Sequence, residues 1–383
     1  MAFGEAGVPV APVLRYALAA ATNRNGYGPV AGTAELREAV AGYWTRRGLP
    51  TYADDVVCGP GSKALLFGLL LALGQAGTSV SVAVPQPSWV SYAAQASLTG
   101  VRAMHVPTPS RRTGGVPDPD LLNAAAAVAA REGQPIAAVI VTLPDNPTGT
   151  LAPAEAVAAV CEVARRHDML IISDEIYRDL VFSDNSGFIS PASLAPERTV
   201  VTSGLSKNLA LGGWRLGVAR LGRSVSPALA ELRDRLLAIG SEIWSSPAAP
   251  VQHAAAIGFS DLPDITSRVR ASRHLHACVT RAVAARFAAV GAQVAPPQGA
   301  FYLYPDFELL RPVLAGRFGI STGADLADVL LDRYGIGVLP GSTFGDPDRA
   351  LRMRVATSRL YGDTPSQQEA ALAADDPTAL PWV

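Results

Sequence analysis

Short runs of β-branched residues alternate with helical patterns along the first half of the chain, and this alternation limits the folds it can adopt. Helical periodicity covers residues 34–47, 63–73, 90–98 and 153–167, and strand-like runs cover residues 55–58, 79–84, 137–142, 170–173 and 199–203. Parallel strands need long crossover connections, which helices provide. The order therefore predicts an α/β fold with a mostly parallel central sheet and helices on both faces.

The pattern changes after about residue 250, where a long helical stretch precedes short strand-like runs. The later segments are QGAFYLYPDF, a helix at residues 325–334, GIGVLPGSTFG and ALRMRVATS. The 383 residues also exceed what one hydrophobic core usually organises. We therefore predict a large domain at residues 20–255 and a smaller α+β domain made of residues 1–19 and 256–383.

The charge balance and the cysteines argue against several classes of function. The net charge of −1, from 32 basic and 33 acidic residues, gives no bulk attraction to nucleic acid or an anionic membrane. The most apolar stretch, residues 64–73, is about half as long as a bilayer span. Cys58, Cys161 and Cys278 lack the spacing of a zinc site or a disulfide framework. With no secretory signal pattern, we expect a cytoplasmic protein without metal, nucleic-acid or membrane partners.

Unusual polar or Gly/Pro-rich sequences follow five consecutive predicted strands. In chain order they are CGPGSK, PQPSW, LPDNPTG, DEIY and SGLSK. The carboxyl ends of parallel strands meet at one edge of a sheet, where the ligands of α/β proteins bind. Turns alone hardly explain five such loops, so we predict the functional site at this edge.

Lys207 and Asp174 are candidates for covalent and electrostatic chemistry. Lys207, in SGLSKNLALGGWRLG, follows a strand, where burial lowers the pKa of an amine and lets it form an imine with a cofactor aldehyde. Asp174 ends an apolar strand, where an ionised carboxylate needs a cationic partner such as a protonated pyridinium nitrogen. Taken alone, a surface lysine and a helix-capping aspartate are the competing interpretations.

Three further residues suit a flat, hydroxylated ring. Asn146, in LPDNPTG, and Tyr177, in DEIY, can hydrogen-bond a phenolate oxygen and so lower the pKa of a neighbouring imine. Trp89, in PSWVSY, can stack on the ring. Each has an ordinary alternative, because Asn-Pro is typical of turns and large aromatic residues are typical of cores.

The first glycine-rich loop suits a phosphate. Gly59, Gly61 and Ser62 precede a helix that starts near Lys63, so free N–H groups and the positive end of the helix dipole face a bound anion. Arg215 can add bidentate binding of the same phosphate. Glycine-rich turns between strands and helices are common, however, so this motif is weak alone.

Two arginines in ALRMRVATS are candidates to clamp a substrate carboxylate. Arg352 is preferred and Arg354 is the competitor. Two residues apart on a strand, both would point to the same face, so the spacing alone does not choose between them.

In order and spacing, these motifs resemble the fold type I, class I/II aminotransferases that depend on pyridoxal phosphate. The resemblance runs through YGPVAGTAELREAV, GPGSKALLFGLLLAL, PSWVSY, DNPTG, SDEIY, SKNLALGGWRLG, GAFYLY and RMRVATS, which together span nearly the whole chain. It implies an enzyme that moves an amino group between an amino acid and a 2-oxo acid by a ping-pong mechanism. It also implies a homodimer with shared active sites.

The resemblance assigns roles to the motif residues. Cofactor contacts are implied for Lys207 (imine), Asp174 (ring nitrogen), Asn146 and Tyr177 (ring hydroxyl), Trp89 (stacking), Ser206 and Arg215 (phosphate) and Tyr27 (the neighbouring subunit's phosphate), and Gly61, Ser62 and Lys63 border the phosphate. Catalytic roles fall to Lys207, Asp174 and Tyr177. Substrate contacts are expected from Arg352, the α-carboxylate clamp, and from Asn146, Trp89 and Lys63.

Lys63 bears on the choice of substrate. GSKALLFGLLLAL and PSWVSY are most similar to the bacterial aspartate and prephenate aminotransferase branch, in which a lysine at this position is implicated in binding the distal carboxylate of the substrate. Lys63 therefore points to acidic substrates. Assisting the phosphate, or lying on a solvated helix face, are the alternatives that stay open.

Two departures limit the resemblance. The chain begins close to FGEAGVP, so the N-terminal arm that covers the site in relatives is expected to be missing or nearly so. Position 204 is glycine, where many relatives have a phosphate-binding Ser or Thr.

The same scaffold also supports β-lyase, decarboxylase, cyclase or oxidase reactions, because the cofactor performs the hard step in all of them. A DNA-binding regulator is not expected without a basic patch.

Overall fold

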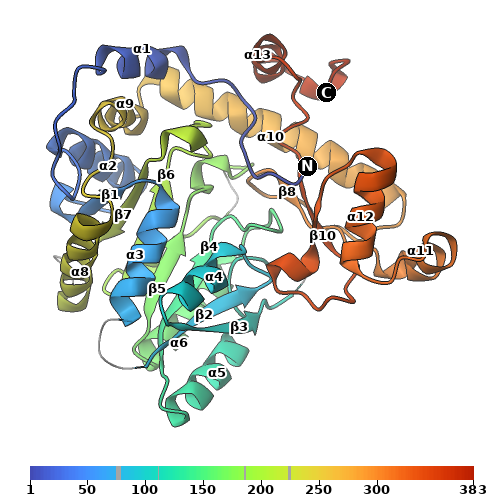
Figure 1. The fold of residues 1–383 in the computed structure, drawn as a ribbon, viewed down its shortest axis with the longest axis horizontal. Helices are drawn as coiled ribbons and strands as arrows, with labels where there is room; N and C mark the ends of the chain where they lie inside the picture. Colours follow the sequence, from blue (N-terminus) through green and yellow to red (C-terminus); the bar gives the residue numbers. More distant parts are fainter. Residues whose placement is uncertain (75–78, 111, 185–186, 223–225) are drawn as a thin grey trace.

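The computed structural model describes residues 1–74, 79–110, 112–184, 187–222 and 226–383. Its elements form a large sheet with helices on both faces and a small sheet next to it (Figure 1). The predicted α/β core with a smaller α+β part is confirmed. The boundary between two domains near residue 255 stays a prediction.

The large sheet sets the position of the functional loops. Its strand order is β1 (Val56–Gly59), β7 (Gly217–Leu221), β6 (Thr199–Gly204), β5 (Leu170–Asp174), β4 (Ile136–Thr142), β2 (Ser81–Gln86) and β3 (Arg102–Pro107). Neighbours from β6 to β3 run parallel, and β7 is antiparallel to both of its neighbours. Thr142, Asp174 and Thr202 lie side by side in the register, so three strands end at one edge.

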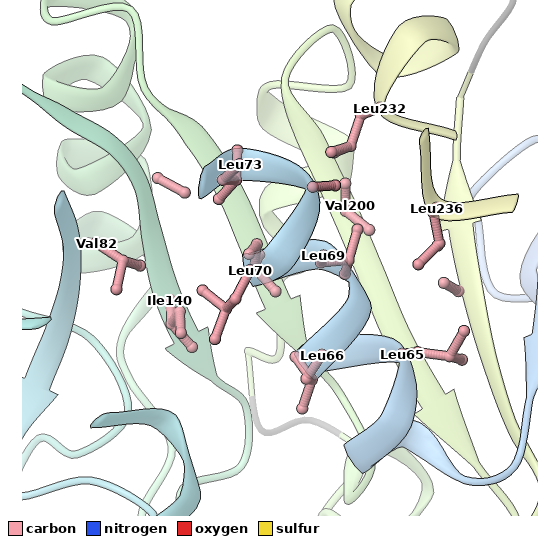
Figure 2. Packing of buried hydrophobic residues seen from close by; sticks show 14 of the residues in the cluster. Leu65, Leu66, Leu69, Leu70, Leu73, Val82, Ile140, Val200, Leu232 and Leu236 are labelled. Carbon is pink, nitrogen blue, oxygen red and sulfur yellow. The ribbon is translucent and has the colours of Figure 1, made fainter. Parts of the chain in front are cut away.

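One face of this sheet is covered by α3 (Ser62–Gly74), α4 (Ser91–Leu98) and α8 (Pro227–Ile243). Figure 2 shows the leucines of α3 between the strands and α8; the labelled residues are Leu65, Leu66, Leu69, Leu70, Leu73, Val82, Ile140, Val200, Leu232 and Leu236. A helix that is apolar on nearly all sides is typically buried in this way. Each buried leucine contributes roughly 1.5–3 kcal/mol, which fixes α3 firmly on the sheet.

The opposite face has two groups of helices. The helices α5 (Pro119–Arg131), α6 (Ala154–Arg166) and α7 (Pro191–Leu194) pack near β4 and β5, and α1 (Pro12–Ala20), α2 (Ala34–Arg46) and α9 (Ala249–Phe259) pack near β1 and β6. In β4, Ala138 and Ile140 contribute to the α3 face, whereas Val139 and Val141 contribute to the α5 and α6 face. Burial on both faces explains why these strands are apolar throughout.

The small sheet is antiparallel, with β10 (Met353–Ala356) between β8 (Tyr302–Leu303) and β9 (Leu339–Pro340). The helices α10 (Pro263–Ala289), α11 (Arg311–Phe318) and α12 (Gly323–Tyr334) share its hydrophobic core, and α13 (Pro365–Ala373) packs on α10. The start of the chain lies next to β8 and β10 (Figure 1), where the Ala356 N–H donates to the Met1 carbonyl at 2.8 Å.

The predicted helices and strands agree with the structure to within two residues at each end. The strands β3 and β7 were not predicted, and neither were several helices, among them α1, α8, α11 and α13. Throughout the described ranges, the helices are too short or too polar to cross a bilayer.

Candidate active site

A cavity of about 790 Å³ opens at the carboxyl edge of the large sheet, and residues of the small sheet complete its wall. Most of the predicted site residues line it, namely Ser62, Lys63, Trp89, Asn146, Asp174, Tyr177, Ser206, Lys207 and Arg215. They lie between residues 62 and 215 of the sequence. The sheet order brings them together, because the strands that precede them are close neighbours.

Asp174, the last residue of β5, is only 3% exposed. The Tyr92 hydroxyl donates to its Oδ2 at 2.8 Å, and the Thr202 hydroxyl donates to its Oδ1 at 3.3 Å. Within the described part of the chain, no cationic side chain is in ion-pair contact with this carboxylate, and burial raises its pKa to about 6. A ligand carrying positive charge would offset that desolvation, so the site fits a protonated ring nitrogen.

The turn after β6 carries Ser206 and Lys207 into the cavity. The Lys207 amine donates to the Gly4 carbonyl. Burial and the nearby Arg354 guanidinium lower the pKa of Lys207 to about 8. About a tenth of the amine is then neutral near pH 7, which suits attack on a carbonyl carbon. Lys63 and Lys207 are the two lysines of the chain, and both line the cavity.

The start of α3 and Arg215 form a cradle for an anion. Since α3 begins at Ser62, its first N–H groups have no acceptor within the helix. Gly61 has a φ of +94°, and a β-carbon there would lie 2.4 Å from Arg215 Nη2. Arg215 also adopts a left-handed backbone, and its Nη1 donates to the Gly212 carbonyl at 2.6 Å. The start of α3 and the guanidinium of Arg215 therefore face the same space, which fits a phosphate.

Gly204 departs from the pattern of relatives for a steric reason. It pairs with Gly217 across β6 and β7, and a β-carbon at position 204 would lie 2.8 Å from the Leu216 carbonyl oxygen. This strand pairing leaves no room for a hydroxyl-bearing side chain, so the anion cradle relies on the other groups.

Trp89 borders the cavity in an ordered aromatic pair. Its ring meets that of Tyr92 edge to face, with centroids 5.3 Å apart. The Lys63 amine lies 4.9 Å from the centre of the Trp89 ring, which is within the range of a cation–π interaction. Lys63 thus lines the cavity, although its side chain as a whole is exposed.

Tyr177 and Asn146 meet residues of the small sheet. The Tyr177 and Tyr302 hydroxyls are 2.8 Å apart, and Arg354 Nη1 donates to Asn146 Oδ1 at 3.1 Å. Arg354 also donates through Nη2 to the Ala2 carbonyl. Its buried Nε has no hydrogen-bond partner among the described residues, so this guanidinium retains a donor.

The structure corrects the prediction that Arg352 faces the ligand, because Arg354 lines the cavity and Arg352 does not. Arg352 precedes β10, and its Nε lies 3.1 Å from Asp346 Oδ2 and 3.8 Å from Asp306 Oδ2. These carboxylates hold it away from the cavity and neutralise its charge. Tyr27 also lies outside the cavity of its own chain and is 96% exposed.

Several cavity residues were not predicted. Tyr92 and Tyr302 line the cavity and lie in the motifs PSWVSY and GAFYLY. For Tyr92 the sequence offered a signal, because a helical turn after Trp89 would place it near that residue. Residues 2–5 also line the cavity. The expectation that little N-terminal cover exists is therefore modified: the first residues lie over Lys207 and Arg354.

A second hollow of about 510 Å³ is lined by charged residues that include Arg47, Asp179 and Asp261. Arg47 donates to Asp179 at 3.0 Å and to Asp261 at 2.7 and 3.1 Å. The carboxylates thus already satisfy the Arg47 guanidinium.

Comparison with known proteins gives a consistent result. The family model for aminotransferase class I and II matches residues 5–360. A probable aspartate/prephenate aminotransferase of Thermus aquaticus is 31% identical over 329 residues, covering 85% of this chain and 78% of the relative. An aspartate/prephenate aminotransferase of Cereibacter sphaeroides is 32% identical over 330 residues, covering 84% and 77%.

A solved structure supports the same assignment. Aspartate aminotransferase from Thermus thermophilus with maleate superposes with a TM-score of 0.81 and 27% identity, covering 97% of this chain and 88% of that chain. Sheet order, cavity and family match agree along nearly the whole sequence. The chain therefore belongs to the class I and II aminotransferases and is a transaminase.

Proposed function

We propose that the transaminase uses pyridoxal phosphate bound covalently through Lys207 and transfers amino groups between an amino acid and a 2-oxo acid. The observation that carries this proposal is the buried Asp174 carboxylate, which has no cationic side chain in ion-pair contact among the described residues and shares one cavity with a nucleophilic lysine. A protonated pyridine nitrogen supplies the missing charge. An aldehyde supplies the partner for the amine.

The remaining contacts follow from the chemistry of the lining groups. Asp174 pairs with the ring nitrogen, and Asn146 and Tyr177 donate to the ring oxygen. The face of the ring packs against Trp89. The phosphate is held by the start of α3 at Gly61, Ser62 and Lys63 and by Ser206 and Arg215.

Lys207 serves as both anchor and base. When bound, the cofactor accepts the electron pair that remains at the substrate α-carbon after proton removal. The Lys207 amine would take the substrate α-proton as a base and later give it back as an acid. Its depressed pKa keeps part of the amine unprotonated at neutral pH, as a base requires.

Arg354 takes the role first given to Arg352, the binding of the substrate α-carboxylate. Its Nε is available, and its guanidinium is positioned by the bond to Asn146. Lys63 is suited to a distal carboxylate, because its amine lies over Trp89 at the cavity. Relatives named for aspartate and prephenate, and a neighbour solved with the dicarboxylate maleate, support acidic substrates.

The proposal includes a cytoplasmic homodimer with shared active sites. The strongly exposed Tyr27 is available to reach the phosphate of a neighbouring subunit. It also includes a large domain at residues 20–255, with residues 1–19 and 256–383 in the small domain. Closure between the two would change the cavity in which Lys207 and Arg354 meet.

The test uses the purified protein loaded with pyridoxal phosphate. Borohydride reduction followed by peptide mapping should place the cofactor on Lys207, and Lys63 provides an internal control because the chain has no other lysine. Lys207→Arg should abolish the visible absorption of the linked cofactor, whereas Lys63→Arg should retain it. Labelling at Lys63 would contradict the proposal.

Transamination itself is tested with a panel of amino acids. A donor alone should convert the bound cofactor to its amine form, and initial-rate plots with both substrates should be parallel. Release of ammonia or carbon dioxide in place of a 2-oxo acid would contradict transamination.

A further inference from the structure

Two tyrosine hydroxyls from different parts of the fold meet in the cavity. Tyr177 follows β5 of the large sheet, and Tyr302 begins β8 of the small sheet. Their oxygens are 2.8 Å apart, and the residues are 3% and 1% exposed. Both line the cavity. A buried pair of this kind has few hydrogen-bonding options, so the direction of its bond is informative.

Each phenol has one proton to donate and can also accept. Burial raises the pKa of both hydroxyls, so both remain protonated. If Tyr177 gives its proton to an oxygen on the cofactor ring, that proton is no longer available to Tyr302. The 2.8 Å contact then persists only with Tyr302 as the donor and Tyr177 as the acceptor.

Arg354 favours this direction. Its guanidinium carbon lies 4.9 Å from the centre of the Tyr302 ring, and its positive charge acts to lower the pKa of the Tyr302 phenol. Burial raises the pKa of Tyr177 well above the usual range. The Tyr302 phenol and the negative Asp174 act in the same direction, and Arg354 opposes them with a smaller effect than burial and Tyr302. The more acidic phenol is the better donor, so Tyr302 should donate to Tyr177.

The hydroxyl of Tyr302 is also positioned by the start of the chain. A β-carbon at Gly4 would lie 2.2 Å from the Tyr302 oxygen, so any side chain at position 4 would displace the hydroxyl or the N-terminal segment. Gly4 itself accepts a hydrogen bond from Lys207. The pair of phenols is therefore held from two sides, by Gly4 and by Arg354.

We propose that Tyr302 is a positioning residue that donates its hydroxyl proton to Tyr177 and thereby strengthens the bond from Tyr177 to the ring oxygen of the cofactor. This inference rests on the proposed role of Tyr177 as a ligand of that oxygen. In a chain of hydrogen bonds each donor polarises the next. More negative charge is then stabilised on the ring oxygen, which lowers the pH at which the linkage between Lys207 and the cofactor loses its proton.

The test is a pH titration of the visible absorption of the loaded enzyme and its variants. Tyr302→Phe should raise the midpoint by about 0.2–0.5 unit, since cooperativity strengthens a hydrogen bond by roughly 10–30%. Tyr177→Phe should raise it by about 1 unit or more, because a bond to charged oxygen is lost. In the Tyr177→Phe background, Tyr302→Phe should add nothing.

The matched control is Tyr304→Phe. The Tyr304 hydroxyl donates to Asp346 at 2.8 Å, close to the same small sheet, but Tyr304 is not among the residues that line the cavity. This variant loses a bond of equal length and should leave the midpoint unchanged. Gly4→Ala is a second probe, because its methyl group would displace the Tyr302 hydroxyl or the N-terminal segment that holds it in place, and either change should raise the midpoint in the same direction.

The outcomes distinguish the role of Tyr177 as a ligand of the ring oxygen from the role of Tyr302 as a donor to Tyr177. A Tyr177→Phe enzyme with an unchanged midpoint would refute the role of Tyr177 and the relay with it. A shift in Tyr177→Phe without one in Tyr302→Phe and Gly4→Ala would refute the relay alone. An equal shift from Tyr302→Phe with and without Tyr177 would also refute it, because the effect would not pass through Tyr177.

Discussion

Replacing Asp174 with asparagine should stabilise the cofactor-free protein while weakening cofactor binding. The carboxylate is almost fully buried, with no ion-pair partner in the described part of the chain, and burial raises its pKa from an ordinary value of 3.8 to about 6. A difference of about 2 units corresponds to roughly 3 kcal/mol of destabilisation near pH 8. An asparagine amide can donate to the Tyr92 hydroxyl, whose own proton can then go to Thr142 at 2.8 Å. About 1–2 kcal/mol of the destabilisation should therefore be recovered.

The pH dependence has a defined sign. Because the folded pKa of Asp174 lies above the unfolded value, the folded state holds the proton more tightly, and stability falls as pH rises between the two values. The destabilisation is small below about pH 4 and complete above about pH 7. The advantage of Asp174→Asn over the wild type should therefore shrink by about 1.4 kcal/mol between pH 8 and pH 5, which removes most of it.

The assay is urea unfolding of cofactor-free wild type and Asp174→Asn at both pH values, combined with the Kd for pyridoxal phosphate. Cofactor affinity should fall about 100-fold, since a buried charge pair loses one partner. The substitution should thus raise the stability of the cofactor-free protein and lower its affinity for the cofactor. An aspartate that served only to cap a helix would not produce this combination. A variant that is less stable than the wild type near pH 8 would refute the reasoning.

Three other substitutions test individual contacts. Arg354→Gln should raise KM for 2-oxo acids about 100-fold through the loss of a bidentate clamp, whereas Arg352→Gln should change it less than about threefold; equal effects in steady-state kinetics would contradict the assignment. Gly61→Ala should weaken cofactor binding at least about tenfold, measured as Kd, because the added methyl group collides with Arg215; an unchanged Kd would argue against the phosphate cradle. Lys63→Gln should raise KM for dicarboxylic amino acids about tenfold and leave that for neutral ones unchanged, and a uniform change would exclude a distal-carboxylate role.

The sequence predicted the large sheet well where the strands are apolar and the loops after them are unusual. It missed β3 and β7 for different reasons. β3 is an edge strand with mostly exposed side chains, so it lacks an apolar run. β7 is interrupted by Arg220, which is buried because its guanidinium donates to Thr51 and to the Pro50 carbonyl. Such partners lie far away in sequence, and the local pattern contains no sign of them.

Prediction of the site from the sequence has the same limit, because contacts between distant parts of the chain are not visible in the local pattern. Asp174, Lys207 and Asn146 could be predicted because each lies at the end of a strand of one sheet or in the loop after it. The meeting of Tyr302 with Tyr177 could not, because it depends on how the small sheet packs against the large one. Local spacing also failed to separate two neighbouring arginines, since the choice was made by acidic residues elsewhere in the small sheet region.

The distribution of charge explains how a nearly neutral chain selects anionic ligands. Lys63, Lys207, Arg215 and Arg354 line the cavity against the carboxylates of Asp174 and Glu5, so positive charge is in excess there although the chain carries −1 overall. Both lysines of the chain line this cavity, and the other positively charged side chains that line it are arginines. Because low-dielectric walls focus the field of such a cluster, it would attract a phosphate or a substrate carboxylate locally although the chain as a whole is nearly neutral. The carbonyls of Ala2 and Gly4, which accept from Arg354 and Lys207, occupy those donors until a ligand competes for them.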